Sequence, residues 1–391
     1  IGGIMAAGLL PAVPAGLSGA ETAGGGKGVK GEIIRRKLGN TGITLPIVSM
    51  GVINANNPEV VRASYELGVR HFDTAANYQS GNNERMVGQV IKELGVRDEV
   101  TIATKIYNPN TREGDGPAET REKLLRQIDE SLERLQMDHV DILYVHNVSS
   151  ADLIMNKAVS DTMKEIRKSG KTRHIGISTH QDMHSVIEAA VAEGSYEVIL
   201  TVINFTMWDY EELLAAIDKA ANKGIGIIAM KTQAGSSRRS RLEFSDEFTA
   251  TTIATASLKW VLRNPNITTA IPGYTTFEHM REDFSVARGI EYDESEKKLL
   301  NGQNVKLGMG FCRQCGICLS SCPNRVDIPT LMRTHMYAAR YSNFHHARLT
   351  LSEIPAGAGL DGCRACGRCV ATCGHEVDIA GGISELMTIY G

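Results

Sequence analysis

Short apolar runs alternate with longer amphipathic stretches from residue 32 onward. The runs are rich in Val, Ile and Thr, which is typical of buried strands. The stretches between them, such as 119–135 and 210–222, carry Glu, Lys and Arg on one face and Leu, Ile and Ala on the other, which predicts helices. The strands that we expect span residues 47–52, 71–75, 101–105, 140–146, 174–178, 198–203, 226–231 and 268–273.

Strand–helix units that repeat eight times over roughly 250 residues are typical of a (β/α)8 TIM barrel. A doubly wound sheet is the alternative, and it would carry a G-x-G-x-x-G segment after its first strand. The segment after Val52 reads Ile53-Asn54-Ala55-Asn56-Asn57 instead, and the glycines at 24–26 have no strand before them. We therefore predict an α/β fold of the TIM-barrel type.

All eight cysteines lie near the C-terminus, in two runs that share the spacing C-x2-C-x2-C-x3-C. The runs are Cys312, Cys315, Cys318 and Cys322, and then Cys363, Cys366, Cys369 and Cys373. This spacing predicts thiolate ligands for iron–sulfur clusters. Zinc is one alternative, although its sites normally use two C-x2-C pairs. Disulfides are the other alternative, and they are open to an exported protein.

The two runs resemble those of bacterial two-cluster ferredoxins, in which the fourth cysteine of each run ligates the other cluster. The resemblance implies two 4Fe-4S clusters with crossed ligand sets. One set would be Cys312, Cys315, Cys318 and Cys373, and the other Cys363, Cys366, Cys369 and Cys322. The spacer between the runs is helical in pattern at 328–341 and 343–351. We therefore expect an α-helical ferredoxin-like module.

The chain divides into a signal-like segment with a linker at 1–31, a barrel at 32–289 and the helical iron–sulfur module at 290–391. Residues 1–26 contain no Lys or Arg and resemble the apolar part and cleavage region of a secretory signal. Because clusters must be assembled in a folded chain, this favours export in folded form, to the periplasm or another extracytoplasmic compartment. A disordered tail on a cytoplasmic protein is the alternative.

The charge balance changes this picture little. The formal net charge is −3 and charged residues make up 22% of the chain, so nothing favours a nucleic-acid partner. Pro11 and Pro14 interrupt the only long apolar stretch, so we expect no membrane span in the mature chain.

Polar side chains follow the second, third and fourth expected strands. Asp73 ends the second strand, Tyr78 follows five residues later, Lys105 ends the third strand and His146 ends the fourth. Each residue alone could be a helix cap, a loop aromatic or a satisfied polar group. Together they lie at the C-terminal ends of barrel strands, where the active sites of TIM barrels are found.

These four residues resemble the Asp, Tyr, Lys and His tetrad of the aldo-keto reductases, and the resemblance extends from about Arg36 to Ala287. It implies reduction of a carbonyl by hydride from NADPH or NADH, with Tyr78 as the proton donor. Lys105 would lower the pKa of the Tyr78 phenol, Asp73 would anchor Lys105, and His146 would orient the carbonyl oxygen. A small carbonyl or alcohol compound is the expected substrate.

The resemblance also implies a set of cofactor contacts: Ser178, Thr179, Met230, Lys231, Ser236, Gly273 and Asp283. Thr179 stands where the family usually has Asn, and Met230 where an aromatic residue usually stacks on the nicotinamide. The choice between NADPH and NADH stays open, because Gly273 and His279 stand where the family often carries cations for the 2′-phosphate. A second hypothesis is an electron-transfer or partner-binding iron–sulfur protein with weakened nicotinamide binding, acting with a redox partner protein.

Overall fold

The computed structural model describes residues 31–107, 116–207, 210–234, 248–301, 312–364, 366 and 368–391. The signal-like segment up to residue 30 and the predicted cofactor residue Ser236 lie outside the described residues. A hairpin of β1 (Arg35–Lys37) and β2 (Thr44–Pro46) precedes the main sheet. In this hairpin the Arg36 guanidinium donates to the carbonyl oxygen of Leu262 over 2.6 Å, which satisfies the end of a barrel helix.

Eight parallel strands form the main sheet, in the same order as in the sequence. They are β3 (Met50–Gly51), β4 (His71–Asp73), β5 (Thr101–Tyr107), β6 (Val140–His146), β7 (Thr172–Thr179), β8 (Val198–Val202), β9 (Gly226–Met230) and β10 (Thr269–Ala270). A parallel bridge between Val48 and Ala270 joins the two edges, so the sheet closes into the predicted barrel.

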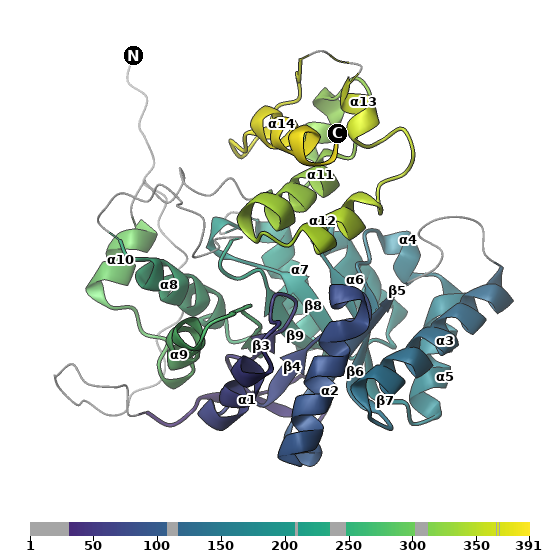
Figure 1. Ribbon diagram of the computed structural model, residues 1–391. Coiled ribbons are helices and arrows are strands. Elements are labelled where there is room, and N and C mark those ends of the chain that lie inside the picture. Colours follow the sequence, from purple (N-terminus) through teal and green to yellow (C-terminus); the bar gives the residue numbers. More distant parts are fainter. Residues whose placement is uncertain are drawn as a thin grey trace.

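Helices surround the barrel, as Figure 1 shows. They are α1 (Pro58–Leu67), α2 (Asn82–Leu94), α3 (Pro117–Leu135), α4 (Ala151–Ile154), α5 (Lys157–Lys168), α6 (Met183–Glu193), α7 (Glu211–Asn222), α8 (Ala250–Leu262), α9 (Phe277–Ser285) and α10 (Glu294–Asn301). Their apolar stripes face the strands; in α3, for example, Leu124, Ile128 and Leu135 are fully buried. The helix α10 is tied to α8 by an ion pair between Glu296 and Lys259, with 2.7 Å between Oε2 and Nζ.

The C-terminal module is helical, as the pattern predicts. It contains α11 (Ile328–His335), a π-helical continuation (Met336–Arg340), α12 (Phe344–Leu351), α13 (Leu360–Arg364) and α14 (Ile379–Tyr390). The triplet Val-Asp-Ile occurs at 326–328 and again at 377–379, in each case just after a cysteine run, and its aspartate caps the helix that follows. Asp327 accepts from the backbone N–H of Thr330 over 3.1 Å, and Asp378 accepts from that of Gly381 over 2.8 Å.

The module lies above the barrel in Figure 1, with α11 and α12 nearest to it. Contacts between the two confirm that these helices cover the C-terminal ends of the strands. Asn343, which caps α12, donates from Nδ2 to Oδ1 of Asn54 over 2.9 Å. Within the described ranges, no helix combines the length and apolar character that crossing a bilayer requires.

Candidate active site and cluster sites

Asp73, Lys105 and His146 belong to three neighbouring strands, so their side chains meet at one edge of the barrel. The Lys105 ammonium pairs with the Asp73 carboxylate and also donates to the carbonyl oxygen of Thr74 over 2.6 Å. It lies 4.9 Å from the centroid of the Tyr78 ring. The Tyr78 and His146 ring centroids are 6.1 Å apart. The structure thus brings the four predicted residues together, all of them buried.

The loop that carries Tyr78 is fixed by the polar motif at the start of α2. Asn83 donates from Nδ2 to the carbonyl oxygens of Val52 and Ala55, over 2.8 and 3.0 Å, and accepts from the Thr74 hydroxyl over 2.7 Å. Glu84 accepts from the Thr104 hydroxyl over 2.5 Å. These buried contacts bind the loops after β3 and β4 to each other, and so hold Tyr78 in place.

Burial sets the protonation of the site. Burial, followed by the Asp73 carboxylate, raises the pKa of Tyr78 well above 10, so its phenol keeps its proton at neutral pH. This direction is opposite to the one expected from Lys105 alone, because Lys105 is already neutralised by Asp73 and lies over the ring. Burial and the charge of Lys105 hold the pKa of His146 well below 6.5, so its imidazole is neutral.

The helical module adds side chains that the sequence did not single out. His346 of α12 lies edge-on to Tyr78, with 5.7 Å between ring centroids, and Tyr337 lies 4.3 Å from His346. On the barrel side, Tyr107 packs on His146 at 4.9 Å and His180 lies at 6.5 Å. For Tyr337 and His346 the only sequence signal was the helical pattern of 328–351, which does not tell which helix face meets the barrel.

A cavity of about 600 Å³ opens beside Tyr78 and runs between the barrel and the module. Its barrel wall includes Asp73, Met230, Lys231, Gly273 and Asp283, and its other wall includes residues 341–345. The predicted cofactor residues Ser178 and Thr179 do not border it. Ser178 accepts from the backbone N–H of Asn147 over 3.0 Å, and Thr179 donates to the carbonyl oxygen of Gln181 over 2.9 Å.

The cavity fits a nicotinamide cofactor in its polar lining. The hydroxyl of Thr232 and Nδ1 of His180 are buried in its wall and lack a hydrogen-bond partner among the described residues. Buried polar atoms of this kind need a partner, which a polar ligand would supply. Met230 can pack against a ring, as the sequence suggests.

A polar clasp joins the module to the barrel at the edge of this cavity. Arg333 of α11 pairs with Glu353 over 2.5 Å and donates to Oδ1 of Asn147 over 2.6 Å. Asn147 follows His146 directly and donates in turn to Glu353 over 2.7 Å. The module is therefore attached to the side chain of the residue that follows a tetrad residue.

The cysteines gather in the crossed arrangement. A cavity of about 420 Å³ is lined by Cys322 of the first run together with Cys363, Cys366 and Cys369 of the second. Burial and the neighbouring thiols Cys322, Cys369 and Cys366 raise the pKa of Cys363 to about 11. Near the other set, burial and the thiols of Cys315 and Cys373 raise the pKa of Cys318 to about 11. Four thiols around one space fit a cubic cluster.

Amide donors reach the cysteine sulfurs. Asn324 donates from Nδ2 to the sulfur of Cys366 over 3.0 Å, and the backbone N–H of His375 donates to that of Cys373 over 3.3 Å. Such N–H···S contacts orient thiolate ligands and stabilise their charge. In the described part of the chain, no three His, Cys, Asp or Glu side chains converge on the position of a single metal ion.

Comparisons with known proteins agree with this architecture. The model of the aldo/keto reductase family matches residues 51–252, and that of a 4Fe-4S dicluster domain matches residues 311–377. L-galactose dehydrogenase of Arabidopsis thaliana is 33% identical over 209 residues, which are 50% of this chain and 63% of that protein. L-glyceraldehyde 3-phosphate reductase of Escherichia coli is 22% identical over 320 residues, covering 68% of this chain and 91% of that protein.

Solved structures show the same barrel. An aldo/keto reductase from Klebsiella pneumoniae in complex with NADP and acetate superposes with a TM-score of 0.53 at 23% identity, covering 67% of this chain and 93% of that chain. A holo-form aldo-keto reductase from Bacillus halodurans gives a TM-score of 0.55 at 19% identity, covering 69% and 95%. The chain belongs to the aldo/keto reductase family of oxidoreductases and carries a 4Fe-4S dicluster domain at its C-terminal end.

Proposed function

We propose that the protein reduces a small carbonyl compound with NADPH or NADH, and that Tyr78 is the proton donor. One observation carries the proposal: a neutral, buried phenol stands beside the Lys105–Asp73 pair at the wall of the 600 Å³ cavity. Among the described residues the Tyr78 hydroxyl has no hydrogen-bond partner, so it can donate to a substrate. Reductase relatives support the same reaction type.

The residues divide the work of the reduction. Met230, Gly273 and Asp283 would hold the nicotinamide cofactor along the cavity, where it would supply a hydride to the carbonyl carbon. Negative charge then develops on the carbonyl oxygen, and Tyr78 transfers its hydroxyl proton there. The Lys105 ammonium stabilises the phenolate that Tyr78 becomes. Neutral His146 positions the oxygen, a role that needs orientation more than acidity.

We further propose two 4Fe-4S clusters, held by the two crossed cysteine sets. The 420 Å³ cavity lined by Cys322, Cys363, Cys366 and Cys369 supports the second set. A fully loaded, anaerobically purified sample should contain about eight iron and eight acid-labile sulfide per chain. Stoichiometric zinc, or only four iron in such a sample, would contradict this proposal.

Electron transfer to or from a partner protein is the second candidate function. It is supported by the contacts that Ser178 and Thr179 make within the protein, away from the cavity, since the family resemblance implies both as cofactor contacts. A titration of the intact, anaerobic protein with NADH and NADPH separates the two candidates. Binding of either, followed by its oxidation on adding an aldehyde, supports the reductase; the absence of binding supports electron transfer.

For location, we propose export of the folded protein. The support is the apolar stretch without Lys or Arg at residues 1–26. N-terminal sequencing of native protein after cell fractionation tests it. An extracytoplasmic protein that begins near Ala15 or Glu21 is expected, whereas a cytoplasmic protein that keeps residues 1–20 would refute export.

A further inference from the structure

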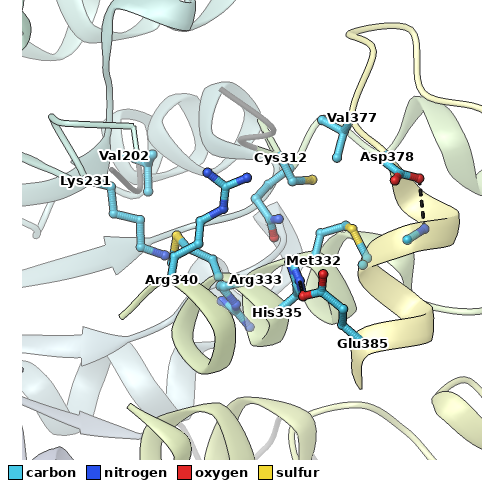
Figure 2. A pocket seen from close by; sticks show the side chains of 14 residues that line it. Val202, Lys231, Cys312, Met332, Arg333, His335, Arg340, Val377, Asp378 and Glu385 are labelled. Atoms are coloured by element: carbon cyan, nitrogen blue, oxygen red, sulfur yellow. Dashed lines mark hydrogen bonds and ion pairs between the residues drawn. The ribbon is translucent and has the colours of Figure 1, made fainter. Parts of the chain in front are cut away.

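Lys231 stands at the junction of two cavities. It follows β9 directly, in a left-handed backbone conformation with φ 54°. Its side chain borders the 600 Å³ cavity beside Tyr78 and also a second cavity of about 220 Å³. Figure 2 shows this second cavity, where Lys231 faces Arg333 and Arg340 of the module, with Cys312 near them. Barrel and module thus contribute positive charges to one space.

No carboxylate in the described part of the chain is left over to match them, and Cys312, a proposed cluster ligand, is the remaining negative group at this cavity. The carboxylates nearby are already engaged: Glu353 pairs with Arg333 over 2.5 Å, Glu385 pairs with His335 over 2.7 Å, and Asp378 caps α14. Neither the Lys231 ammonium nor the Arg340 guanidinium has a hydrogen bond or ion pair to any described residue. In addition, Nε of Arg333 is buried and lacks a partner there.

A buried cation without a counter-charge is unfavourable, because it has lost water and gained no partner. Burial and the nearby charge of Arg333 accordingly hold the pKa of Lys231 well below 10.5. An anionic ligand would relieve this cost through charge-assisted hydrogen bonds from both cations. The cavity is therefore prepared for an oxyanion.

Two rings connect Lys231 with the catalytic phenol. The Lys231 ammonium lies 4.9 Å from the centroid of the Tyr337 ring, Tyr337 lies 4.3 Å from His346, and His346 lies 5.7 Å from Tyr78. Burial lowers the pKa values of the neighbouring His180 and His146, and the positive charge of Lys231 lowers them further. A ligand that contacts Lys231 can therefore extend along this wall to Tyr78.

We propose that Lys231 and Arg333 form an oxyanion subsite that binds the carboxylate or phosphate group of an anionic carbonyl substrate. The subsite is shared between barrel and module, which gives the module a part in substrate selection. The inference rests on the proposed reductase function, whose substrate class it names. It differs from the role of cofactor contact that the family resemblance implies for Lys231, and the experiment separates the two.

Kinetics with matched substrates test the subsite in the intact, cluster-loaded protein. Glyoxylate carries a carboxylate, glyceraldehyde 3-phosphate carries a phosphate, and methyl glyoxylate is neutral. For Lys231→Met we expect KM to rise at least about tenfold for the preferred anionic substrate, and to change less than about twofold for the neutral ester. Lys231→Arg keeps the positive charge and should therefore restore most of the affinity for the anionic substrate. Lys219→Met, at a surface ion pair with Glu188, is the matched control.

Binding of oxalate and inorganic phosphate, measured by calorimetry on the protein with NADH or NADPH present, gives a readout independent of reduction. Oxalate or phosphate binding that Lys231→Met weakens about tenfold supports the subsite even if no carbonyl is reduced, in which case the proposed function fails alone. An equal rise in KM for the charged and the neutral substrates in Lys231→Met would overturn the subsite. Weakened nicotinamide binding in Lys231→Met, with unchanged oxalate and phosphate binding, would also overturn it. A change in that variant confined to the cluster that contains Cys312 would do the same.

Discussion

Tyr78 shows how opposing effects decide the state of a single residue. The sequence places a lysine near the phenol, which by itself predicts a lowered pKa. In the folded protein the charge of Lys105 is neutralised by its ion pair with Asp73, while burial of Tyr78 raises the pKa of the phenol. The outcome is a phenol that stays protonated throughout the neutral range, as its proposed role of proton donor requires. Activity should therefore not depend on loss of the Tyr78 proton between pH 6 and pH 9.

Replacing Tyr78 with Phe removes the proposed proton donor and little volume. We expect turnover of a carbonyl substrate to fall at least about a hundredfold, as general-acid catalysis implies, while nicotinamide binding stays within a few-fold. Steady-state kinetics and a fluorescence titration measure the two effects. Tyr65→Phe is the control, because the Tyr65 hydroxyl bonds to Glu99 away from the site. A variant with more than about a tenth of wild-type turnover would remove Tyr78 from the mechanism.

Three buried histidines predict a loss of stability in acid. Burial, with nearby cations, lowers the pKa of His146, His180 and His346, the last to about 3. The folded state keeps them neutral, whereas the unfolded chain protonates them below about pH 6.5. The unfolded state thus binds more protons below this pH. The contribution of these histidines to stability is therefore fully present above pH 6.5 and declines as pH falls from 6.5 toward 3. The decline is at most about 1.4 kcal/mol per histidine and pH unit.

The melting temperature at pH 7.5 and pH 5.5 measures this effect. His346→Gln should reduce the drop in melting temperature between these two values, because one proton-binding difference is removed. His184→Gln, at a partly exposed position of α6, should leave the drop unchanged. An identical drop in all three proteins would assign the acid sensitivity to other groups.

At the scale of elements, the contact of α2 with α3 depends on a residue without a side chain. A Cβ atom at Gly88 of α2 would lie 2.1 Å from the carbonyl oxygen of Leu135, at the end of α3. No real side chain can approach a backbone oxygen so closely, so the helices would have to move apart. Asn83 and Glu84, which hold the Tyr78 loop, belong to the same helix.

We therefore expect Gly88→Ala to destabilise the protein by about 1–3 kcal/mol or more, through overpacking, and to lower turnover by shifting the Tyr78 loop. Gly116→Ala is a suitable control, because no atom of the described residues lies within 4 Å of a Cβ there and the backbone φ is −65°. Thermal unfolding followed by circular dichroism compares the two variants. Equal melting temperatures would show that α2 can shift at no cost.

At the scale of the whole molecule, the module acts as a roof over the barrel site. Val326 and Ile328, at the start of α11, border the cavity of the second cysteine set. The same helix carries Arg333 to Asn147, and Tyr337 follows in its continuation. Loss of the cluster proposed for that cavity should therefore loosen the roof. This would give a one-electron centre a structural role in the proposed hydride-transferring enzyme.

Cys322→Ala tests this connection. Under crossed ligation the variant should lose the cluster of Cys363, Cys366 and Cys369, leaving about four iron per chain. Hydrogen exchange should accelerate across 328–351, while the buried strand β6 stays protected. Ser320→Ala, a neighbour outside the cysteine sets, should behave like the wild type. Loss of only the cluster that contains Cys312 would contradict crossed ligation.

Local patterns were sufficient for the barrel and for much of the site. Strand ends can be read from the alternation of apolar and amphipathic segments, and parallel neighbouring strands bring their C-terminal ends to one edge. This is why Asp73, Lys105 and His146 can be grouped from the amino-acid sequence alone. The cysteine spacing is equally local. The domain boundaries at 31 and 289 stay predictions.

Only the tertiary structure decided that Ser178 and Thr179 bond to other parts of the protein. It also decided which residues of the module lie at the site, namely Arg333, Tyr337 and His346. A helical pattern in the sequence shows that one face is apolar, but not which surface that face will meet. Hydroxyl groups likewise bind whatever partner folding brings near, here Asn147 and Gln181. Contacts between residues more than a hundred positions apart depend on how two separately patterned units dock, and no periodicity within either unit encodes that.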